Sequence, residues 1–360
     1  MSNARTLASY ASNFPSFRNR IINGDMRIDQ RNDGGSVTPT LGQFMVDRWR
    51  AAVSQTSKLS AQQNAGSVTP PAGFINYLGI TSLSAYSVGT SDFFDIRQPI
   101  EGLNIADLAW GTANASTVTL SFWVRSSLTG TFGGALKNKD GTRSYPFSYT
   151  VSSANTWEQK SITITGDTTG NWLTNNAISI QVQFGLGAGS TYSGTAGSWA
   201  SANYVSATGA TSVVGTSGAT FYITGVQLEE GTVATPFEHR PYGTELALCQ
   251  RYYEVWSGNG YNGVGSGGCV ATNGVDLIYQ FLVQKRSSVT ATISAAGDFY
   301  MAGSNWGVPT TCNSIGFLYS TDKNVFIQAR SASTPLTIGQ SGVFGSNNTS
   351  NAKLNFSAEL

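Results

Sequence analysis

Short runs in which apolar and polar residues alternate recur along the chain, and they limit the fold more than any other feature of the sequence. The clearest runs in the first two thirds of the chain span residues 118–125, 161–164, 178–184 and 220–223. A period of two places alternate side chains on opposite faces of a β-strand, so each run predicts a strand with one face in a core. The 41 glycines supply the tight turns that short strands need. We therefore predict an all-β protein built of antiparallel sandwiches.

A charged segment with two prolines, residues 231–243, separates two sets of predicted strands. After it, residues 245–253 fit one or two helical turns that lead into a strand. The glycine-rich segment 263–268 is predicted to form turns. Further strands are predicted at residues 277–283, 289–293, 316–319, 324–327 and 353–358. These strands indicate a second, smaller β-sandwich.

The N-terminal residues predict a short helix followed by the start of the sheet. Leu7, Tyr10, Phe14 and Phe17 recur at spacings of three and four, which indicates an amphipathic helix over residues 5–17. Such a short helix needs a surface to dock on, supplied by a partner protein, a sister subunit or its own domain. Residues 21–28 are predicted as the first strand, with a turn or bulge at Asn-Gly-Asp. The expected parts are an attachment segment at 1–19, a first sandwich at 20–240 and a tip domain at 241–360.

The composition excludes several classes of partner. Charged residues make up only 11% of the chain, and the 21 basic residues are scattered along it. A net charge of +1 without a basic stripe argues against nucleic-acid binding. No run of about 18 apolar residues and no signal peptide are seen, so we expect synthesis in the cytoplasm and no membrane insertion. The cysteines, Cys249, Cys269 and Cys312, lack disulfide or zinc spacing and are predicted to be free.

Few residues are available for catalysis. His239 is the single histidine, and it lies between two prolines without a Ser or Cys motif, so we expect it to be structural. Neither Glu101 with Asp107 nor Glu229 with Glu230 belongs to a hydrolase motif. Glu229 and Glu230 are adjacent, so on a strand they would face opposite ways and could not both line one cleft. We therefore expect no enzymatic activity, with a glycan depolymerase as the less favoured alternative.

Aromatic residues in polar loops are the candidate binding residues. Sugar recognition combines aromatic faces with amides or carboxylates that bond the hydroxyl groups. In the first domain the candidates lie in loops rich in Gly, Ser and Asn: Trp157, Trp172, Tyr192, Trp199 and Tyr204. In the second domain they are Trp256, Tyr261 and Trp306. For the first set, packing as a lid on the core or between subunits is an equally open interpretation.

Four segments resemble a known family when they are taken in order. Residues 19–31, with Asp47-Arg48-Trp49, are similar to the opening of many phage tail-fibre and minor virion proteins. Residues 120–127, "LSFWVRSS", resemble a strand of these proteins. Residues 221–238 resemble their closing strand, and "LCQRYY" at 248–253 is similar to the segment that follows.

This resemblance implies a jelly roll of the galactose-binding-like or carbohydrate-binding-module type, in a virion component that is commonly a trimer. It implies a homotrimer whose N-terminal segment contacts other virion proteins and whose loops adhere to a host surface glycan. A capsid or tail decoration protein (head fibre) with a purely architectural role is the alternative. Related modules often bind calcium between the opening strand and an Asp-Asp pair in the closing strand. Thr224-Gly225 stands at that place here, so we expect no cofactor and assign Asp25 to a turn.

Overall fold

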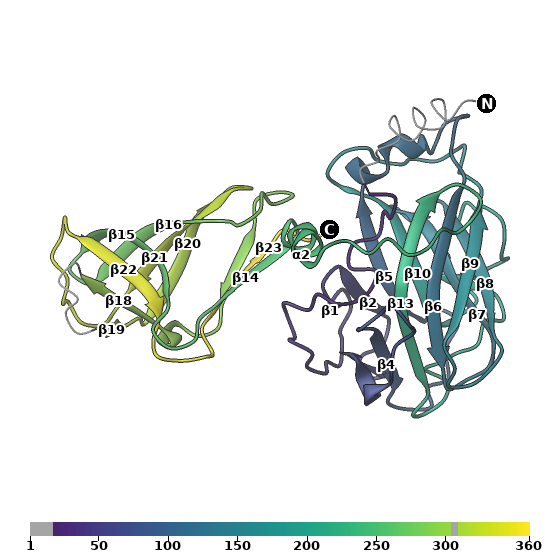
Figure 1. The fold of residues 1–360 in the computed structure, drawn as a ribbon, viewed down its shortest axis with the longest axis horizontal. Helices are drawn as coiled ribbons and strands as arrows, with labels where there is room; N and C mark the ends of the chain where they lie inside the picture. The colour runs from purple at the N-terminus through teal and green to yellow at the C-terminus, as the bar shows by residue number, and fades with distance from the viewer. Residues whose placement is uncertain (1–16, 304–308) are drawn as a thin grey trace. The chain divides into compact units, whose positions relative to one another are not determined.

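The computed structural model describes residues 17–303 and 309–360, in two compact units, Met1–Pro241 and Tyr242–Leu360. We call these the first and second units. Both are built of antiparallel sheets, which confirms the predicted all-β class (Figure 1). The predicted N-terminal helix lies outside the described residues except for Phe17, so the attachment segment stays a prediction.

The first unit is a jelly-roll-like sandwich of two antiparallel sheets. The six-stranded sheet has the order β1 (Phe44–Val46), β2 (Trp49–Val53), β5 (Phe93–Glu101), β10 (Ile178–Ala188), β7 (Gly130–Asn138) and β8 (Ser144–Val151). The five-stranded sheet has the order β3 (Leu59–Gln63), β4 (Leu78–Ser82), β13 (Thr220–Glu230), β6 (Val118–Ser126) and β9 (Glu158–Ile164). The short elements are the parallel pair β11 (Ser193–Gly194) and β12 (Ser206–Ala207), with η1 (Ala65–Ser67), η2 (Gly102–Asn104) and η3 (Ala106–Leu108).

Period-two alternation forms the core between these sheets. On β6, Leu120, Phe122 and Val124 are fully buried, while Trp123 and Arg125, which alternate with them, are only partly buried. Burying one such apolar side chain stabilises the fold by roughly 1.5–3 kcal/mol. The same alternation leaves Trp123 on the outer face of the five-stranded sheet.

The strand predicted at residues 21–28 is wrong, because this segment forms turns. Asn23 and Met26 have φ angles of 56° and 57°, outside the extended region. The Asn23 amide donates to the backbone oxygens of Ile28 (2.8 Å) and Asp47 (2.9 Å). The Trp49 indole donates to the Asn23 oxygen at 3.0 Å. The "NGD" and "DRW" segments of the family resemblance are therefore joined in one structural network.

Gly24 in this network allows a close backbone approach. The Val226 N–H donates to the Gly24 oxygen at 2.9 Å. A Cβ at position 24 would lie 2.2 Å from the Val226 oxygen and 3.3 Å from the Phe237 ring. Only glycine fits there, so it lets β13, together with Phe237 from the segment after it, pack against the N-terminal turns.

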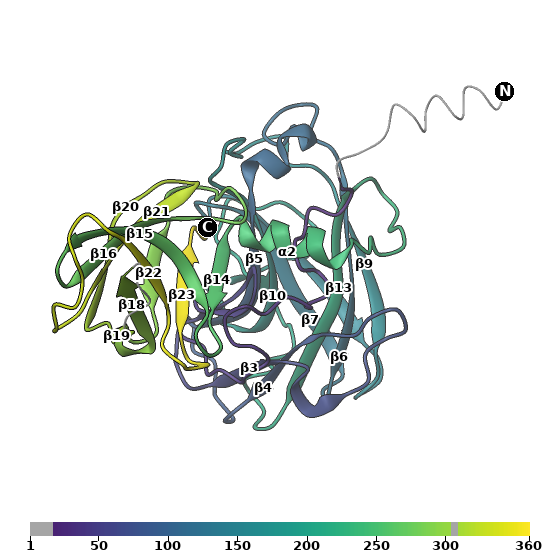
Figure 2. The ribbon, with the colours of Figure 1, turned by 60° about the vertical axis from the view of Figure 1, so that its left-hand side comes forward.

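The second unit begins with α2 (Tyr242–Gln250) and contains two further antiparallel sheets. The three-stranded sheet has the order β14 (Tyr253–Ser257), β23 (Lys353–Ser357) and β17 (Thr290–Ile293), and Figure 2 shows β14 beside β23. The seven-stranded sheet has the order β19 (Thr310–Thr311), β18 (Phe299–Gly303), β22 (Ser341–Ser346), β15 (Gly263–Ala271), β16 (Gly274–Gln280), β21 (Asn324–Arg330) and β20 (Ser314–Ser320). A short helix, η4 (Ala296–Asp298), precedes β18. Buried side chains from both sheets form one core.

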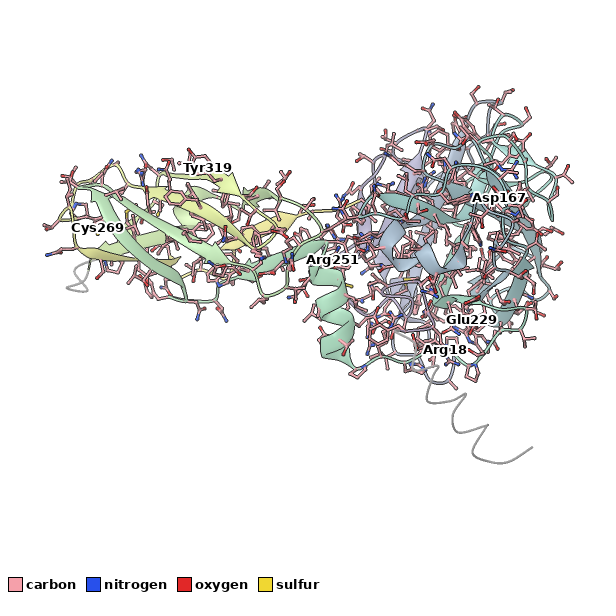
Figure 3. All side chains as sticks on the ribbon, turned by 90° about the horizontal axis from the view of Figure 1, so that it is seen from above. Arg18, Asp167, Glu229, Arg251, Cys269 and Tyr319 are labelled. Atoms are coloured by element: carbon pink, nitrogen blue, oxygen red, sulfur yellow. The ribbon has the colours of Figure 1, made fainter. Side chains whose placement is uncertain are left out.

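The prediction of turns at residues 263–268 is wrong, because this segment lies within strand β15. Its glycines let the neighbouring strand come close: a Cβ at Gly267 would lie 2.0 Å from the Asp276 oxygen. The three cysteines form no disulfide with one another, in agreement with the prediction, and all three are buried (Cys269 is labelled in Figure 3).

Candidate functional site

A groove of about 640 Å³ lies on the outer face of the five-stranded sheet. Its floor includes Trp123 of β6, with Gln159 and Ser161 of β9. Trp123 pairs with Gln159 on one side and with Thr224 of β13 on the other, so it lies within the sheet and not at its edge. The walls are the segments 72–74 and 234–239.

The walls bring three rings together beside Trp123. Phe74 and Phe237 meet edge to face, with ring centroids 5.1 Å apart. His239 lies 5.4 Å from Phe74 and 4.9 Å from Phe237. Such pairs add attraction beyond the apolar area that they bury, so the rings stabilise one another. The predicted structural role of His239 agrees with this packing.

Gly225 allows the rings to approach the sheet. It has a φ of 60°, and the pairing of β13 with β6 shifts register between Thr224 and Gln227. A Cβ at position 225 would lie 2.6 Å from the Phe74 ring and 3.1 Å from the Trp123 ring. The bulge and its glycine therefore set the distance between one wall and the floor.

Hydrogen bonds from its own residues and from neighbouring segments hold the second wall. The Glu229 carboxylate accepts from the Thr235 N–H at 2.8 Å and from its hydroxyl at 2.7 Å. The Glu238 N–H donates to the Gln227 side chain at 2.9 Å, and the Glu238 carboxylate accepts from the Arg18 N–H at 3.0 Å. Figure 3 labels Glu229 and Arg18. The groove is thus largely preformed, which lowers the ordering cost of binding.

The chemistry of the groove suits a ligand with both apolar and hydroxyl-bearing faces. Gln159 and Ser161 are exposed and offer an amide and a hydroxyl next to the Trp123 ring. The volume of about 640 Å³ lies within the range of small-molecule sites. A pyranose has C–H groups that can contact the Trp123 ring and hydroxyl groups that can bond the Gln159 amide.

Two of the predicted binding residues, Trp172 and Trp199, lie together elsewhere in the first unit. Their ring centroids are 5.5 Å apart, and Trp110 lies 4.9 Å from Trp172 and 5.4 Å from Trp199. Tyr145 lies 5.3 Å from Trp199. We call Trp110, Tyr145, Trp172 and Trp199 the tryptophan cluster. It packs with the hydrophobic core, and Trp172 is only 7% exposed.

The indole groups of Trp172 and Trp199 in the tryptophan cluster are bonded to the protein itself. The Trp199 indole donates to the Thr165 oxygen at 2.8 Å, and the Trp172 indole donates to the Thr169 oxygen at 3.0 Å. Asp167, labelled in Figure 3, accepts two hydrogen bonds from Arg143 at 2.8 and 2.6 Å. Burial opposes its ionisation, but the hydrogen bonds outweigh burial and hold the pKa of Asp167 below its usual value. These rings support the structure here, and sugar binding by them stays a prediction.

The structure does not bring the other candidates of the first unit into this cluster. Trp157 lies against Tyr77, with ring centroids 5.5 Å apart, and its indole donates to the Thr69 oxygen at 2.9 Å. Tyr192 packs on Phe93 at 5.0 Å. Tyr204 is partly buried beside Gly194, where a Cβ would lie 2.3 Å from its ring.

The candidates of the second unit differ in exposure. Trp256 is partly buried, 6.3 Å from Phe299 by ring centroids. Tyr261 is 58% exposed and packs edge to face on Tyr300. Trp306 lies outside the described residues. Tyr261 is therefore the more exposed of the two described candidates of this unit.

Sequence reasoning did not assign the groove. Trp123 is not among the predicted binding residues, although its alternation with the buried residues of the "LSFWVRSS" strand places it away from the core. Phe74 and Phe237 are far from it in the sequence, and no local pattern pairs them with Trp123. The one sequence signal for the groove is the proline-flanked segment "PFEHRP" at 236–241, because prolines make a segment rigid and this one follows the closing strand.

No metal site is apparent among the described residues. Asp25 is 3.1 Å from Arg27 in an ion pair, and burial raises its pKa. No group of three or more His, Cys, Asp or Glu side chains able to hold a metal is found within residues 17–303 and 309–360. In the same part of the chain no helix is long and apolar enough to cross a membrane.

Comparison with solved structures gives matches at low identity. The enzymatically active domain of tailspike protein 4 from bacteriophage CBA120 is 11% identical, with a TM-score of 0.32 over 59% of this chain and 22% of that chain. A family 4 carbohydrate-binding module is 14% identical, with a TM-score of 0.31 over 58% of this chain and 98% of the module. A family 11 module from Clostridium thermocellum, solved with a β-1,3-1,4-mixed-linked tetrasaccharide, is 14% identical, with a TM-score of 0.27 over 57% and 98%.

The sequence comparisons found no relative. No protein-family model matches the chain, and no curated protein matches it. The structural neighbours are carbohydrate-binding modules and a phage tailspike domain. At such identities and TM-scores they carry no functional argument, so the case for function rests on the groove.

Proposed function

We propose that this chain is a phage virion protein, of the tail-fibre or receptor-binding kind, that binds a host surface glycan without cleaving it. The groove over Trp123 is the proposed glycan site. The observation that carries the proposal is a partly buried tryptophan face, fixed in a sheet between two ordered walls and next to an exposed amide and hydroxyl.

The physical basis is stacking on a preformed platform. An aromatic face attracts the apolar C–H face of a sugar, and the polar groups at its rim orient the hydroxyls. Because ring packing holds the wall at 72–74 and hydrogen bonds hold the wall at 234–239, little side-chain freedom is lost on binding. Tryptophans at the centre of such a site are the residues whose truncation costs most.

The absence of cleavage is proposed from the lining of the groove. Glycoside hydrolysis generally uses two carboxylates that flank the scissile bond. The described residues that line the groove include no Asp or Glu. This favours adhesion over a depolymerase.

The virion assignment is supported by the family resemblance of the segments between residues 19 and 253. Two of these segments contribute to the groove: residues 120–127 supply Trp123 of its floor, and residues 221–238 supply part of one wall. Residues 248–253 belong to the second unit. The homotrimer and the N-terminal attachment segment stay predictions.

The Trp123→Ala variant is expected to weaken glycan binding by about 2 kcal/mol or more, roughly 30-fold. Binding of the labelled full chain to an array of bacterial surface glycans identifies the ligand, and titration calorimetry then compares the variants. Trp123→Phe keeps a ring and should retain part of the affinity. Tyr261→Ala removes an exposed ring from the second unit and is the matched control. Unchanged affinity in a folded Trp123→Ala protein, or loss only in Tyr261→Ala, would refute the groove as the site.

The location on the virion separates adhesion from decoration. Immunogold microscopy of intact virions, with antibody against residues 245–360, is expected to label the tail or fibre tips. Label over the capsid would favour the decoration alternative. Virions without label would contradict the virion assignment.

A further inference from the structure

A second concave site lies on the outer face of the six-stranded sheet. It is a recess of about 140 Å³ whose lining includes Arg97, Lys137, Tyr192 and Asn203. Arg97 alternates with the buried Ile96 on β5, and Lys137 alternates with the buried Leu136 on β7. Both cations therefore project from the face of the sheet that points away from the core.

The cations of the recess outnumber the carboxylates that neutralise them. Arg97 holds both oxygens of Asp95, at 2.7 and 2.6 Å. Lys137 is only 6% exposed, yet its ammonium donates to the neutral side chain of Asn203 at 2.8 Å. Within the described residues no carboxylate lies within ion-pair distance of Lys137. A buried ammonium without a carboxylate is costly unless another anion is present.

A buried amide on β10, the strand between β5 and β7, has no hydrogen-bond partner among the described residues. Gln183 on β10 lies directly opposite Arg97, so its side chain projects from the same face of the sheet. Its side chain is 0% exposed, and within the described residues neither its nitrogen nor its oxygen has a hydrogen-bond partner. Buried amides are nearly always bonded, so one unpaired next to a cation-lined recess points to a ligand.

We infer that this recess is a second binding site, for a single oxyanion such as the carboxylate of an acidic sugar or a phosphate group. Its volume of about 140 Å³ is below the range of sites for whole drug-sized ligands, so one charged group or one small residue of a glycan fits it. Lys137 and Arg97 supply the charge, and Gln183 supplies a neutral donor. Tyr192, packed on Phe93, forms part of the wall. The inference does not depend on the groove over Trp123, which lies on the other sheet.

The protonation of Lys137 is linked to such a ligand. Lys137 is near Arg97 and Asp95 from β5, Arg50 from β2 and Tyr192 of the wall. Burial, followed by repulsion from Arg97, lowers the pKa of Lys137 to about 8. An anion needs the protonated ammonium, so its binding is expected to weaken as the pH rises from 7 to 9.

The test is titration of the full chain at pH 7 with three probes: D-glucuronate, inorganic phosphate and D-glucose. Binding is monitored by NMR or calorimetry. Binding of glucuronate alone identifies an acidic sugar, and binding of phosphate, alone or together with glucuronate, identifies a site for oxyanions in general. Either result supports the site if Lys137→Met weakens it by roughly tenfold or more, as expected for loss of a charged hydrogen bond.

The controls separate this site from the groove and from general charge. Lys139→Met removes an exposed lysine just after the same strand and should leave anion binding unchanged, as should Trp123→Ala. Absence of binding by both anions at tens of millimolar, glucose binding as strong as that of glucuronate, or equal affinity in Lys137→Met and wild type would overturn the inference.

Discussion

Replacing Lys285 by alanine is expected to destabilise the second unit by about 3–5 kcal/mol, because it leaves a buried carboxylate without its cation. Lys285 and Glu254 form an ion pair of 2.5 Å, and both side chains are fully buried. The Lys285 ammonium also donates to the Gln250 oxygen at 2.6 Å, at the end of α2. Glu254 in turn accepts from the Tyr279 hydroxyl at 3.1 Å.

The pair joins three parts of the second unit: α2, β14 and the segment after β16. Burial lowers the pKa of Lys285, although Glu254 opposes this effect. Glu254 therefore favours the charged form of Lys285. Removing either partner alone should cost much more than replacing both by apolar residues of similar size.

Urea unfolding of the full chain, followed by circular dichroism and by limited proteolysis, measures this effect. Lys323→Ala, at an exposed lysine of the same unit, is the matched control and should change stability by less than about 0.5 kcal/mol. The double variant Lys285→Met/Glu254→Leu should recover most of the loss. Equal stabilities of Lys285→Ala and Lys323→Ala would show that the pair does not hold the unit together.

Replacing Trp172 by alanine is expected to destabilise the first unit by about 3–5 kcal/mol, as for other large aromatic side chains removed from a core. Trp172 packs edge to face on Trp110 and Trp199, and its indole is bonded to the Thr169 oxygen. The variant leaves a cavity and unpairs that oxygen. The midpoint of the first unit's thermal unfolding transition measures the loss of stability.

The same variant separates the two interpretations of the tryptophan cluster. If Trp172 supports the structure, the folded fraction of Trp172→Ala at low temperature keeps the glycan affinity of the wild type. Its matched partner is Trp123→Ala, which should lose affinity with little loss of stability. A stable Trp172→Ala protein that no longer binds glycan would instead favour the cluster as the binding platform.

The strands could be predicted from the sequence where alternation was strong. Residues 118–125 lie within β6 and residues 178–184 within β10, because each has one fully apolar face. Residues 263–268 lacked that signal, since glycine has no side chain to alternate, although a strand forms there. The turns at residues 21–28 depend on bonds from Asn23 to Asp47, a contact that no local pattern reveals.

The site was harder to predict than the fold. Their place in polar loops predicted Trp172 and Trp199 as binding residues. In the structure their indole groups are bonded to the backbone, and their rings contact Trp110 and Tyr145. The groove instead joins Phe74, Trp123 and Phe237 from separate segments. Long-range contacts of this kind arise from strand order, which one sequence alone does not fix.

The crystal structure of the full chain with the glycan selected on the array is the most direct test of the central claim. Our account predicts a sugar ring stacked on Trp123, with hydroxyls bonded to Gln159 or Ser161 and the walls unmoved. A sugar bound at the tryptophan cluster, or on the second unit with the groove empty, would contradict it.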